Sequence, residues 1–474
     1  MIKYIFTLAV LLIASTTVKA DDGAYDIKIE VNGIHNDNAI LAYYFSESKY
    51  IRDTIHFDEN GVGYITDTAE IPTGVYLLAF PQLKLNYFEL ILGEEKRFSM
   101  KTDTSNLVKQ MIVENSLENE LFYQNLKYML DVGKTSHELK ESIKGLDKSD
   151  SEYERLNQEL VQLDKEVKKY RKDLAAKHPD SYYSTVFNMM EDVEIPENPN
   201  PNDSAFAYRY YQNHYFDNMD LTDERLSRTP VFLSRIKKFL DYYTLPYPDS
   251  INASIDRIIA MAEPNYNMYQ IVVSSIFNKY AKSNIMTHEL VYVHMAKKYY
   301  AHPEVVDWIE EEQRAKIVDL VRKKEPTLLG NIAPDIVIAD IEGKTRTLYE
   351  EAEARDYTIL VIWNSGCGHC KTEMPILRDL YESEIKSLAN IGVFAISTEL
   401  EYDEWTKFIF ENELNKENWV HCIDIYGSNM FRVKYDVTST PIVIILDKQK
   451  KILAKRINVE DIPGLLSYEI NKNK

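Results

Sequence analysis

The stretch "WNSGCGHCK", Trp363 to Lys371, places two of the chain's three cysteines three positions apart. The apolar run "TILVIW" directly precedes it and is typical of a buried strand, while a helix is predicted to begin at Cys367. A cysteine at a helix N-terminus faces free N–H groups and the positive end of the helix dipole, which stabilise the thiolate. Cys370 lies one turn later on the same face. The spacing therefore predicts a redox-active pair in which Cys367 attacks and Cys370 resolves the mixed disulfide.

A structural zinc site and a purely structural disulfide fit this pair less well. A zinc site needs four ligands, and the chain has no second CxxC. His288-Glu289 resembles the start of a zinc-protease helix, but the residue four positions after His288 is Tyr292. A CxxC loop is also too short to restrain much chain entropy. We therefore predict no metal at the pair, and no cofactor beyond the Cys367–Cys370 disulfide itself.

The residues around the pair alternate between strands and helices, which is typical of an α/β domain. The segments are "DIVIADIEGKTRTL", "TILVIW", a helix from Cys367, "IGVFAIS", "YDEWTKFIFENEL", "WVHCI", a helix at residues 428–435, "PIVIILD" and "KILAKRI". The last two predict a closing hairpin. We assign residues 330–474 to this domain. The third cysteine, Cys422 in "WVHCI", is predicted to be a buried strand residue, since an unpaired cysteine behaves as a small apolar side chain.

Two further regions precede this domain. Residues 24–103 alternate apolar and polar side chains in short segments such as "YDIKIEV" and "GVYLLAF", which predicts an antiparallel, sandwich-like β domain. Residues 115–325 change to helical periodicity. Within them, Tyr153 to Leu174 carry apolar side chains at alternating spacings of three and four, a heptad seam. We interpret the seam as one arm of a helical hairpin, with a dimerising coiled coil as the alternative. The predicted fold class is thus multidomain: antiparallel β, then all-α, then α/β.

The first twenty residues are typical of a secretory signal peptide. Lys3 supplies the positive start, "YIFTLAVLLIA" the apolar run, and "VKA" the small residues before cleavage after Ala20. An uncleaved anchor is the alternative. We expect the protein to work outside the cytoplasm, where disulfide exchange is normal. The formal charge of −20 argues against nucleic-acid binding, because an acidic surface repels phosphate.

The segments "PDIVIADIEGKTRTL" and "ILVIWNSGCGHCKTEMPIL" resemble TlpA/ResA-like members of the thioredoxin superfamily. The resemblance covers about residues 330–455 and includes Trp363, Pro375 and the pair Thr440-Pro441. It implies a thioredoxin fold with a cis bond before Pro441, and a substrate-binding surface that includes Trp363, Thr440 and Pro441. The β and helical regions that precede it resemble the envelope architecture common in Bacteroides-type bacteria.

The motif departs from the familiar pattern at two positions. Gly366 stands where a tryptophan usually precedes the first cysteine, which opens the surface around the sulfur. Val361 stands where thioredoxin carries a buried acid. Glu373, one turn beyond Cys370, matches a glutamate that ResA-like proteins use for proton transfer. The resemblance therefore implies that Glu373 manages the proton of Cys370, and an ordinary solvated helix residue is the alternative.

His369 bears on the direction of electron flow. "CGHC" is the motif of protein disulfide isomerases, and a cationic imidazole beside the thiolate stabilises the reduced form. It thus favours oxidant or isomerase chemistry, whereas the TlpA/ResA likeness implies a reductase. The direction stays open at this point, and so does the oligomeric state.

The pattern as a whole predicts an extracytoplasmic thiol–disulfide oxidoreductase. Its expected partners are protein thiols and disulfides of the cell envelope and an upstream thiol donor. A thiol peroxidase is one alternative, although Asn364 stands three before Cys367 where that family has Thr or Ser. The other alternative is a binding scaffold that has inherited a thioredoxin fold without using it.

Overall fold

The computed structural model describes residues 24–427 and 429–472, so the predicted signal peptide (residues 1–20) lies outside the described residues. The described chain divides into two compact units. The first runs to Phe239 and includes Met261–Ile271, and the second contains Leu240–Ala260 and the chain from Val272 onward. The order of β, helical and mixed α/β regions confirms the predicted multidomain fold class.

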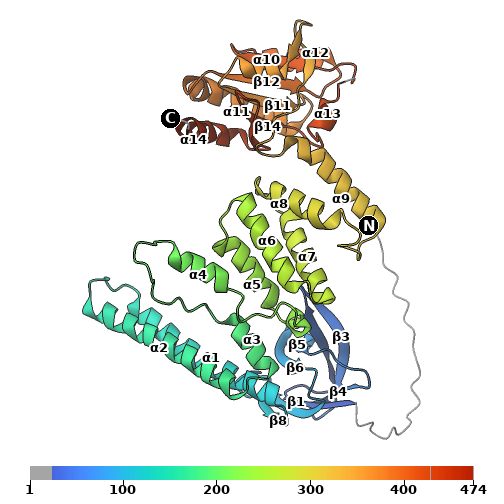
Figure 1. Cartoon of the computed structure of the whole chain (residues 1–474). Coiled ribbons are helices and arrows are strands. Elements are labelled where there is room, and N and C mark those ends of the chain that lie inside the picture. The colour runs from blue at the N-terminus through green and yellow to red at the C-terminus, as the bar shows by residue number, and fades with distance from the viewer. Residues whose placement is uncertain (1–23, 428, 473–474) are drawn as a thin grey trace, which may run out of the picture. The chain divides into compact units, whose positions relative to one another are not determined.

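Two four-stranded sheets form the β part of the first unit, and a single apolar core includes side chains of both (Figure 1). One sheet has the order β4-β1-β7-β8, with β4 at Val62–Asp67, β1 at Tyr25–Asn32, β7 at Arg97–Asp103 and β8 at Ile112–Glu114. The other has the order β3-β2-β5-β6, with β3 at Ser48–Phe57, β2 at Asp37–Phe45, β5 at Gly74–Phe80 and β6 at Asn86–Leu92. The pairing is antiparallel except between β1 and β7, which run parallel.

Strand β3 departs from the alternating apolar pattern, because its first seven side chains are exposed or only half-buried. It is an edge strand held to β2 by backbone hydrogen bonds. An edge strand needs no strict alternation of apolar side chains, so the pattern is weak there.

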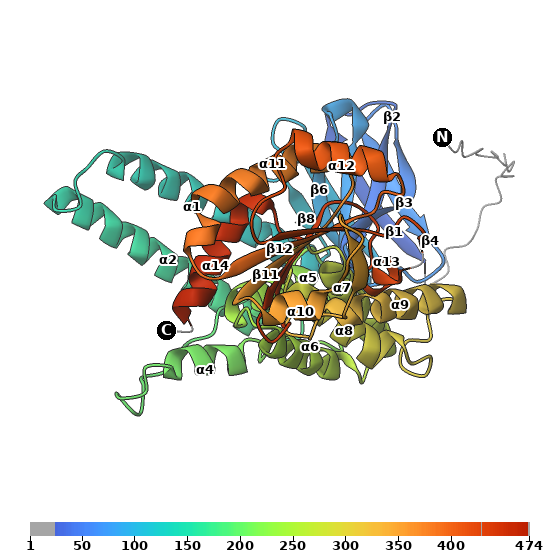
Figure 2. The same cartoon turned by 90° about the horizontal axis from the view of Figure 1, so that it is seen from above.

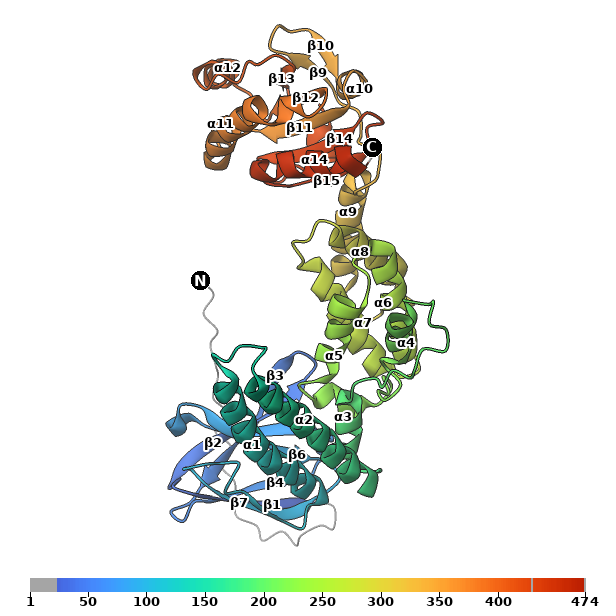
Figure 3. The same cartoon turned by 90° about the vertical axis from the view of Figure 1, so that its left-hand side faces the viewer.

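The heptad seam forms one arm of a helical hairpin, as predicted. Helices α1 (Leu117–Ile143) and α2 (Ser151–Lys177) lie side by side in Figures 1 and 3. Tyr128 of α1 stacks on Tyr170 of the seam with ring centroids 3.9 Å apart. Asp150 caps α2 by accepting a hydrogen bond from the backbone N–H of Glu152. The first unit continues with α3 (Tyr182–Met190), α4 (Phe206–His214) and α5 (Phe232–Lys238).

Asn119 attaches α1 to the β part of the first unit. Its side chain is fully buried, and its amide accepts from the N–H of Ile91 at 2.8 Å and donates to the carbonyl of Ile91 at 2.9 Å. Ser116 caps the helix and accepts from the backbone N–H of Asn119. A buried amide that satisfies both polar groups of one strand residue fixes where the helix begins relative to β6.

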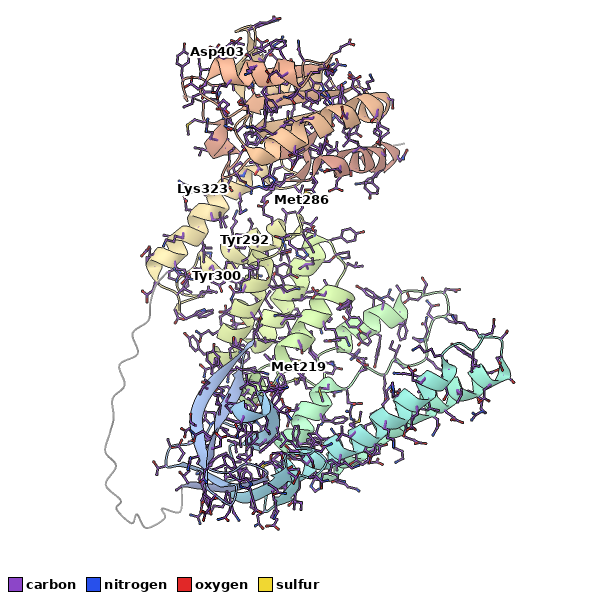
Figure 4. All side chains as sticks on the ribbon, turned by 180° about the vertical axis from the view of Figure 1, so that it is seen from behind. Met219, Met286, Tyr292, Tyr300, Lys323 and Asp403 are labelled. Atoms are coloured by element: carbon purple, nitrogen blue, oxygen red, sulfur yellow. The ribbon has the colours of Figure 1, made fainter. Side chains whose placement is uncertain are left out.

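The helices that follow belong mainly to the second unit. They are α6 (Pro248–Ala262), α7 (Tyr266–Ala281), α8 (His288–Met295) and α9 (Glu311–Lys324). Tyr292 and Tyr300, both labelled in Figure 4, pack their rings against Phe277 at centroid distances of 5.2 and 3.9 Å. Among the helices described, none combines the length and the apolar character that crossing a membrane requires.

A seven-stranded mixed sheet forms the C-terminal part of the second unit, with the order β10-β9-β13-β12-β11-β14-β15. Strands β11 (Tyr357–Trp363), β12 (Ile391–Ser397) and β13 (Trp419–Ile423) run parallel. The hairpin of β14 (Ile442–Asp447) and β15 (Ile452–Lys455) closes one edge as predicted, and β9 (Val337–Asp340) and β10 (Thr345–Thr347) form the other.

Helices cover both faces of this sheet, so it has two apolar cores. Helices α11 (Gly368–Ser383), α12 (Tyr402–Glu411) and α14 (Ile462–Lys472) cover one face, and α10 (Leu348–Glu353) and α13 (Phe431–Lys434) cover the other. Figure 2, which looks onto this domain, shows α11 and α12 on one side of β11 and β12 and α10 on the other. All seven residues of β11 are buried as a result.

Asn119→Ala should loosen the attachment of α1 to β6. The change leaves the N–H and the carbonyl of Ile91 without their partner, at about 1–3 kcal/mol for each buried group. We expect the free energy of local opening around Ile91 and Asn119 to fall by about 2–6 kcal/mol. Hydrogen–deuterium exchange of the peptides that cover these residues measures it. Gln158→Ala, on the exposed face of α2, is the control, and equal exchange in both variants would contradict this role of Asn119.

Candidate redox site

Strand β11 and helix α11 together position the two cysteines. Asn364, Ser365 and Gly366 connect the buried strand to the helix, and Cys367 is the N-cap residue of α11, with φ −78° and ψ 127°. The N–H of Cys367 donates to the carbonyl of Asn364 at 3.1 Å. Cys367 is half-buried and Cys370 is fully buried. Both are free thiols in this structure.

The two thiols differ in acidity, as the predicted roles require. The backbone N–H of Cys370 is the largest cause that lowers the pKa of Cys367, because it points at the sulfur from the first turn of the helix. Burial raises the pKa of Cys370 to about 11, since the surrounding core disfavours its thiolate. Cys367 is therefore the thiol that ionises first and reaches solvent.

The segment that contains Thr440 faces the first cysteine. The Cys367 thiol donates to the carbonyl oxygen of Thr440 at 3.3 Å, and the Thr440-Pro441 bond is cis, as the resemblance implied. Thr440 and Pro441 are half-buried. A cavity of about 350 Å³ opens beside the sulfur. Its lining consists of Asn364, Gly366, Cys367, Thr398, Arg432, Val437, Thr438, Ser439 and Thr440.

Trp363 does not contribute to a binding surface, and the prediction that it contacts substrate is wrong. Its side chain is fully buried, and its ring packs on Phe408 with centroids 5.4 Å apart. Trp363 belongs to the core between β11 and α12. A docked polypeptide contacts the surface of this domain and not its interior. Trp363 therefore packs in the core beneath the site and does not contact the substrate.

Glu373 and His369 lie on the first turns of α11. Glu373 is half-buried, and its pKa is raised, first by burial and then by the nearby charge of Glu460. The pKa shift of Cys367 includes a contribution from the backbone N–H of His369. The His369 side chain is exposed, and its charge lowers the pKa of Glu373. The imidazole therefore acts on Glu373, an effect that the motif alone does not predict.

Three residues around the turn, Ser365, Thr398 and Glu399, were not identified from the sequence. Ser365 Oγ and the N–H of Gly366 both donate to Oε1 of Glu399, at 2.7 and 3.0 Å, and the Asn364 amide donates to Oγ1 of Thr398 at 3.1 Å. The sequence contained one indication that Thr398 and Glu399 lie near the cysteines. Both directly follow the predicted strand "IGVFAIS", and the carboxyl ends of parallel strands meet at one edge of a sheet.

Cys422 is fully buried in β13, which confirms the prediction that it is a core residue. Burial raises its pKa far above that of an ordinary thiol, so it stays protonated. Across residues 24–427 and 429–472, no group of three or more His, Cys, Asp or Glu side chains is arranged to bind a metal ion.

Comparison with protein families gives two matches. Residues 355–452 match a family model described as thioredoxin-like, which covers the site. Residues 151–324 match a domain of unknown function, DUF5106.

Several characterised and solved proteins are similar to the C-terminal part of the chain. The thiol-disulfide oxidoreductase ResA of Bacillus cereus is 27% identical over 145 residues, which is 31% of this chain and 79% of that protein. ResA of Geobacillus thermodenitrificans is 27% identical over 152 residues, which is 30% of this chain and 77% of that protein. A solved domain of a possible thiol-disulfide isomerase from Cytophaga hutchinsonii is 37% identical. The match covers 31% of this chain and 99% of that domain, with a TM-score of 0.28.

Reaction with iodoacetamide should distinguish the two thiols. Because the pKa of Cys367 is lowered, its alkylation should reach half of its maximal rate below about pH 8.5, the value of an ordinary thiol. Cys370 and Cys422 should stay unmodified over the same pH range, since both are buried and their pKa values are raised. Mass spectrometry of the reduced protein identifies the modified residue. Modification of Cys370 before Cys367 would contradict the assignment.

Glu373→Gln should slow the step in which Cys370 attacks the mixed disulfide. The raised pKa of Glu373 leaves a carboxylate that is a better base, so the wild-type rate should rise as pH increases through its pKa. Without that base we expect a loss of about 10²-fold near pH 7. The loss should shrink toward pH 11, where Cys370 ionises unaided. Single-turnover kinetics measure the step, Glu382→Gln on the same helix is the control, and a wild-type profile would make Glu373 an ordinary helix residue.

Proposed function

The chain belongs to the TlpA/ResA-like proteins of the thioredoxin superfamily, and on this basis we propose that it is an extracytoplasmic thiol–disulfide oxidoreductase. It exchanges disulfides with envelope proteins through Cys367 and Cys370. The observation that carries the proposal is the asymmetry of the pair: an accessible thiol of lowered pKa beside a buried thiol of raised pKa.

The reaction runs in two exchanges. The Cys367 thiolate attacks one sulfur of a substrate disulfide; that S–S bond breaks, and the other substrate sulfur leaves as a thiolate. Cys370 then loses its proton, with Glu373 as the proposed acceptor, and attacks the sulfur of Cys367. The mixed disulfide breaks, the second substrate thiolate departs, and a Cys367–Cys370 disulfide remains. Two electrons have passed from the pair to the substrate, and an upstream thiol donor restores the pair.

The site supports this chemistry with its own groups. The first-turn N–H groups stabilise the Cys367 thiolate, and the Thr440 carbonyl lies 3.3 Å from the sulfur, at the mouth of the cavity. Thr440 and Pro441 are the proposed contacts for the substrate backbone. The exchange needs no cofactor besides the cysteine pair, which serves as the redox group.

The resemblance to TlpA/ResA-like proteins implied a reductase, and this motivates the proposed direction. His369 is the residue that opposes it, because an imidazolium near the helix start favours the reduced pair and makes it a stronger oxidant. Its exposed side chain acts on Glu373, and this weakens the case for oxidation. We therefore propose a reductase. The predicted signal peptide at residues 1–20 supports an envelope location, which suits protein disulfides as substrates.

The two alternatives fit the site less well. A peroxidase of the related type uses a Thr or Ser ahead of its cysteine, and Asn364 in that position donates to Thr398 and accepts from Gly366. An inherited, unused fold would not need a solvent-accessible, half-buried thiol of lowered pKa. Partner selection is the role proposed for the β and helical regions.

Cys370→Ala should trap substrates. Without the resolving thiol, Cys367 stays linked to the protein it attacks, so full-length Cys370→Ala expressed with residues 1–20 should accumulate higher-mass adducts that dithiothreitol removes. Cys367→Ala/Cys370→Ala should form none. Cys422→Ala is the matched control and should behave as wild type, because Cys422 is fully buried in β13. An exported and folded trap variant without adducts would overturn the proposed function.

A further inference from the structure

Glu399 lies in the loop after β12 and contacts the turn that leads into the first cysteine. Its carboxylate oxygen Oε1 accepts from Ser365 Oγ at 2.7 Å and from the N–H of Gly366 at 3.0 Å. Ser365 is buried, with 7% of its surface exposed. One carboxylate from a distant part of the chain therefore binds both residues directly before Cys367.

The backbone around Glu399 is held to the sheet by hydrogen bonds. Its N–H donates to Oγ of the fully buried Ser397 at 3.0 Å, and the N–H of Thr398 donates to the carbonyl of Trp363 at 2.8 Å. Arg432 donates to the carbonyl of Thr398 at 2.5 Å. The segment that carries Glu399 is thus anchored at successive residues, so its carboxylate is a stable support for the turn.

Glycine at position 366 fits this arrangement. Its N–H donates to Oδ1 of Asn364 at 2.8 Å as well as to Glu399. A Cβ at this position would lie 3.0 Å from that Asn364 oxygen and 3.6 Å from the Glu399 oxygen. Glycine therefore gives the Asn364 oxygen room to approach the N–H, whereas the Glu399 oxygen would stay at an ordinary contact distance from a Cβ. Glycine thus replaces the familiar tryptophan at a position where Glu399, from another loop, binds the backbone N–H.

We propose that Glu399 is a positioning residue for disulfide exchange: it holds the turn at Ser365 and Gly366 so that the Cys367 sulfur lies at the first N–H groups of α11 and faces the Thr440 carbonyl. The inference rests on the proposed function, whose nucleophile it serves. Glu399 acts through the backbone before the cysteine and takes no part in bond making. Its effect on the rate comes from alignment, where small displacements of a nucleophile are costly.

The test compares Glu399→Ala with Glu399→Gln. Glutamine keeps an oxygen that can accept both hydrogen bonds, whereas alanine removes them. At a pH where Cys367 is fully ionised, Glu399→Ala should react with a small aromatic disulfide about tenfold more slowly than wild type, because the nucleophile is misaligned. Glu399→Gln should stay within about twofold of wild type, since the acceptor is retained. Glu401→Ala, in the same loop and exposed, is the control and should match wild type.

A second readout separates alignment from a general loss of structure. The pH of half-maximal alkylation of Cys367 should rise in Glu399→Ala, because the sulfur moves away from the helix N–H groups that stabilise its thiolate. It should not rise in Glu399→Gln. Ser365→Ala removes one of the two hydrogen bonds and should slow the reaction by about threefold. It keeps the inference testable if Glu399→Ala does not fold.

Wild-type rates and alkylation profiles in Glu399→Ala and Ser365→Ala would overturn the inference, and so would a Glu399→Gln variant as slow as Glu399→Ala, because charge and not the acceptor would then matter. A wild-type protein that reduces no disulfide, but whose alkylation profile shifts in Glu399→Ala, would overturn the proposed function and leave the positioning role intact.

Discussion

The hydrogen bond that the first turn of α11 offers to the Cys367 sulfur is the interaction on which the site depends. It lowers the pKa of that thiol, and it exists only because the helix begins at the cysteine itself. The start of the helix is set by β11. This strand lies between β12 and β14, and the helix begins just after its carboxyl end. The chemistry is thus a consequence of where one buried strand ends.

Burial gives the second cysteine its complementary character. Cys370 lies in the core that β11, α11 and α12 share, and this environment raises its pKa to about 11. Two thiols three residues apart therefore differ in ionisation because one faces the cavity and the other the core. The same core excludes Trp363 from the surface, so the residues left beside the sulfur come from loops at the sheet edge.

Those loops come from three separate parts of the chain. Residues 364–366 follow β11, residues 398–399 follow β12, and residues 437–440 precede β14. Hydrogen bonds between the first two loops make the turn before Cys367 a shared structure, and the third supplies the Thr440 carbonyl. Such a site combines a buried sheet below with polar loop residues around the sulfur. The fully buried Cys422 lies apart from this chemistry and serves packing.

The sequence by itself determined what local pattern controls. The CxxC spacing after an apolar run located the pair, alternating strands and helices indicated the α/β domain, and the heptad seam at Tyr153–Leu174 indicated the hairpin. The tertiary structure alone decided which side chains meet across the chain. It buried Trp363, brought Glu399 to Ser365, and paired the exposed strand β3 with β2. The physical reason is that period and spacing report on neighbours along one element, whereas burial and long-range hydrogen bonds depend on how separate elements pack.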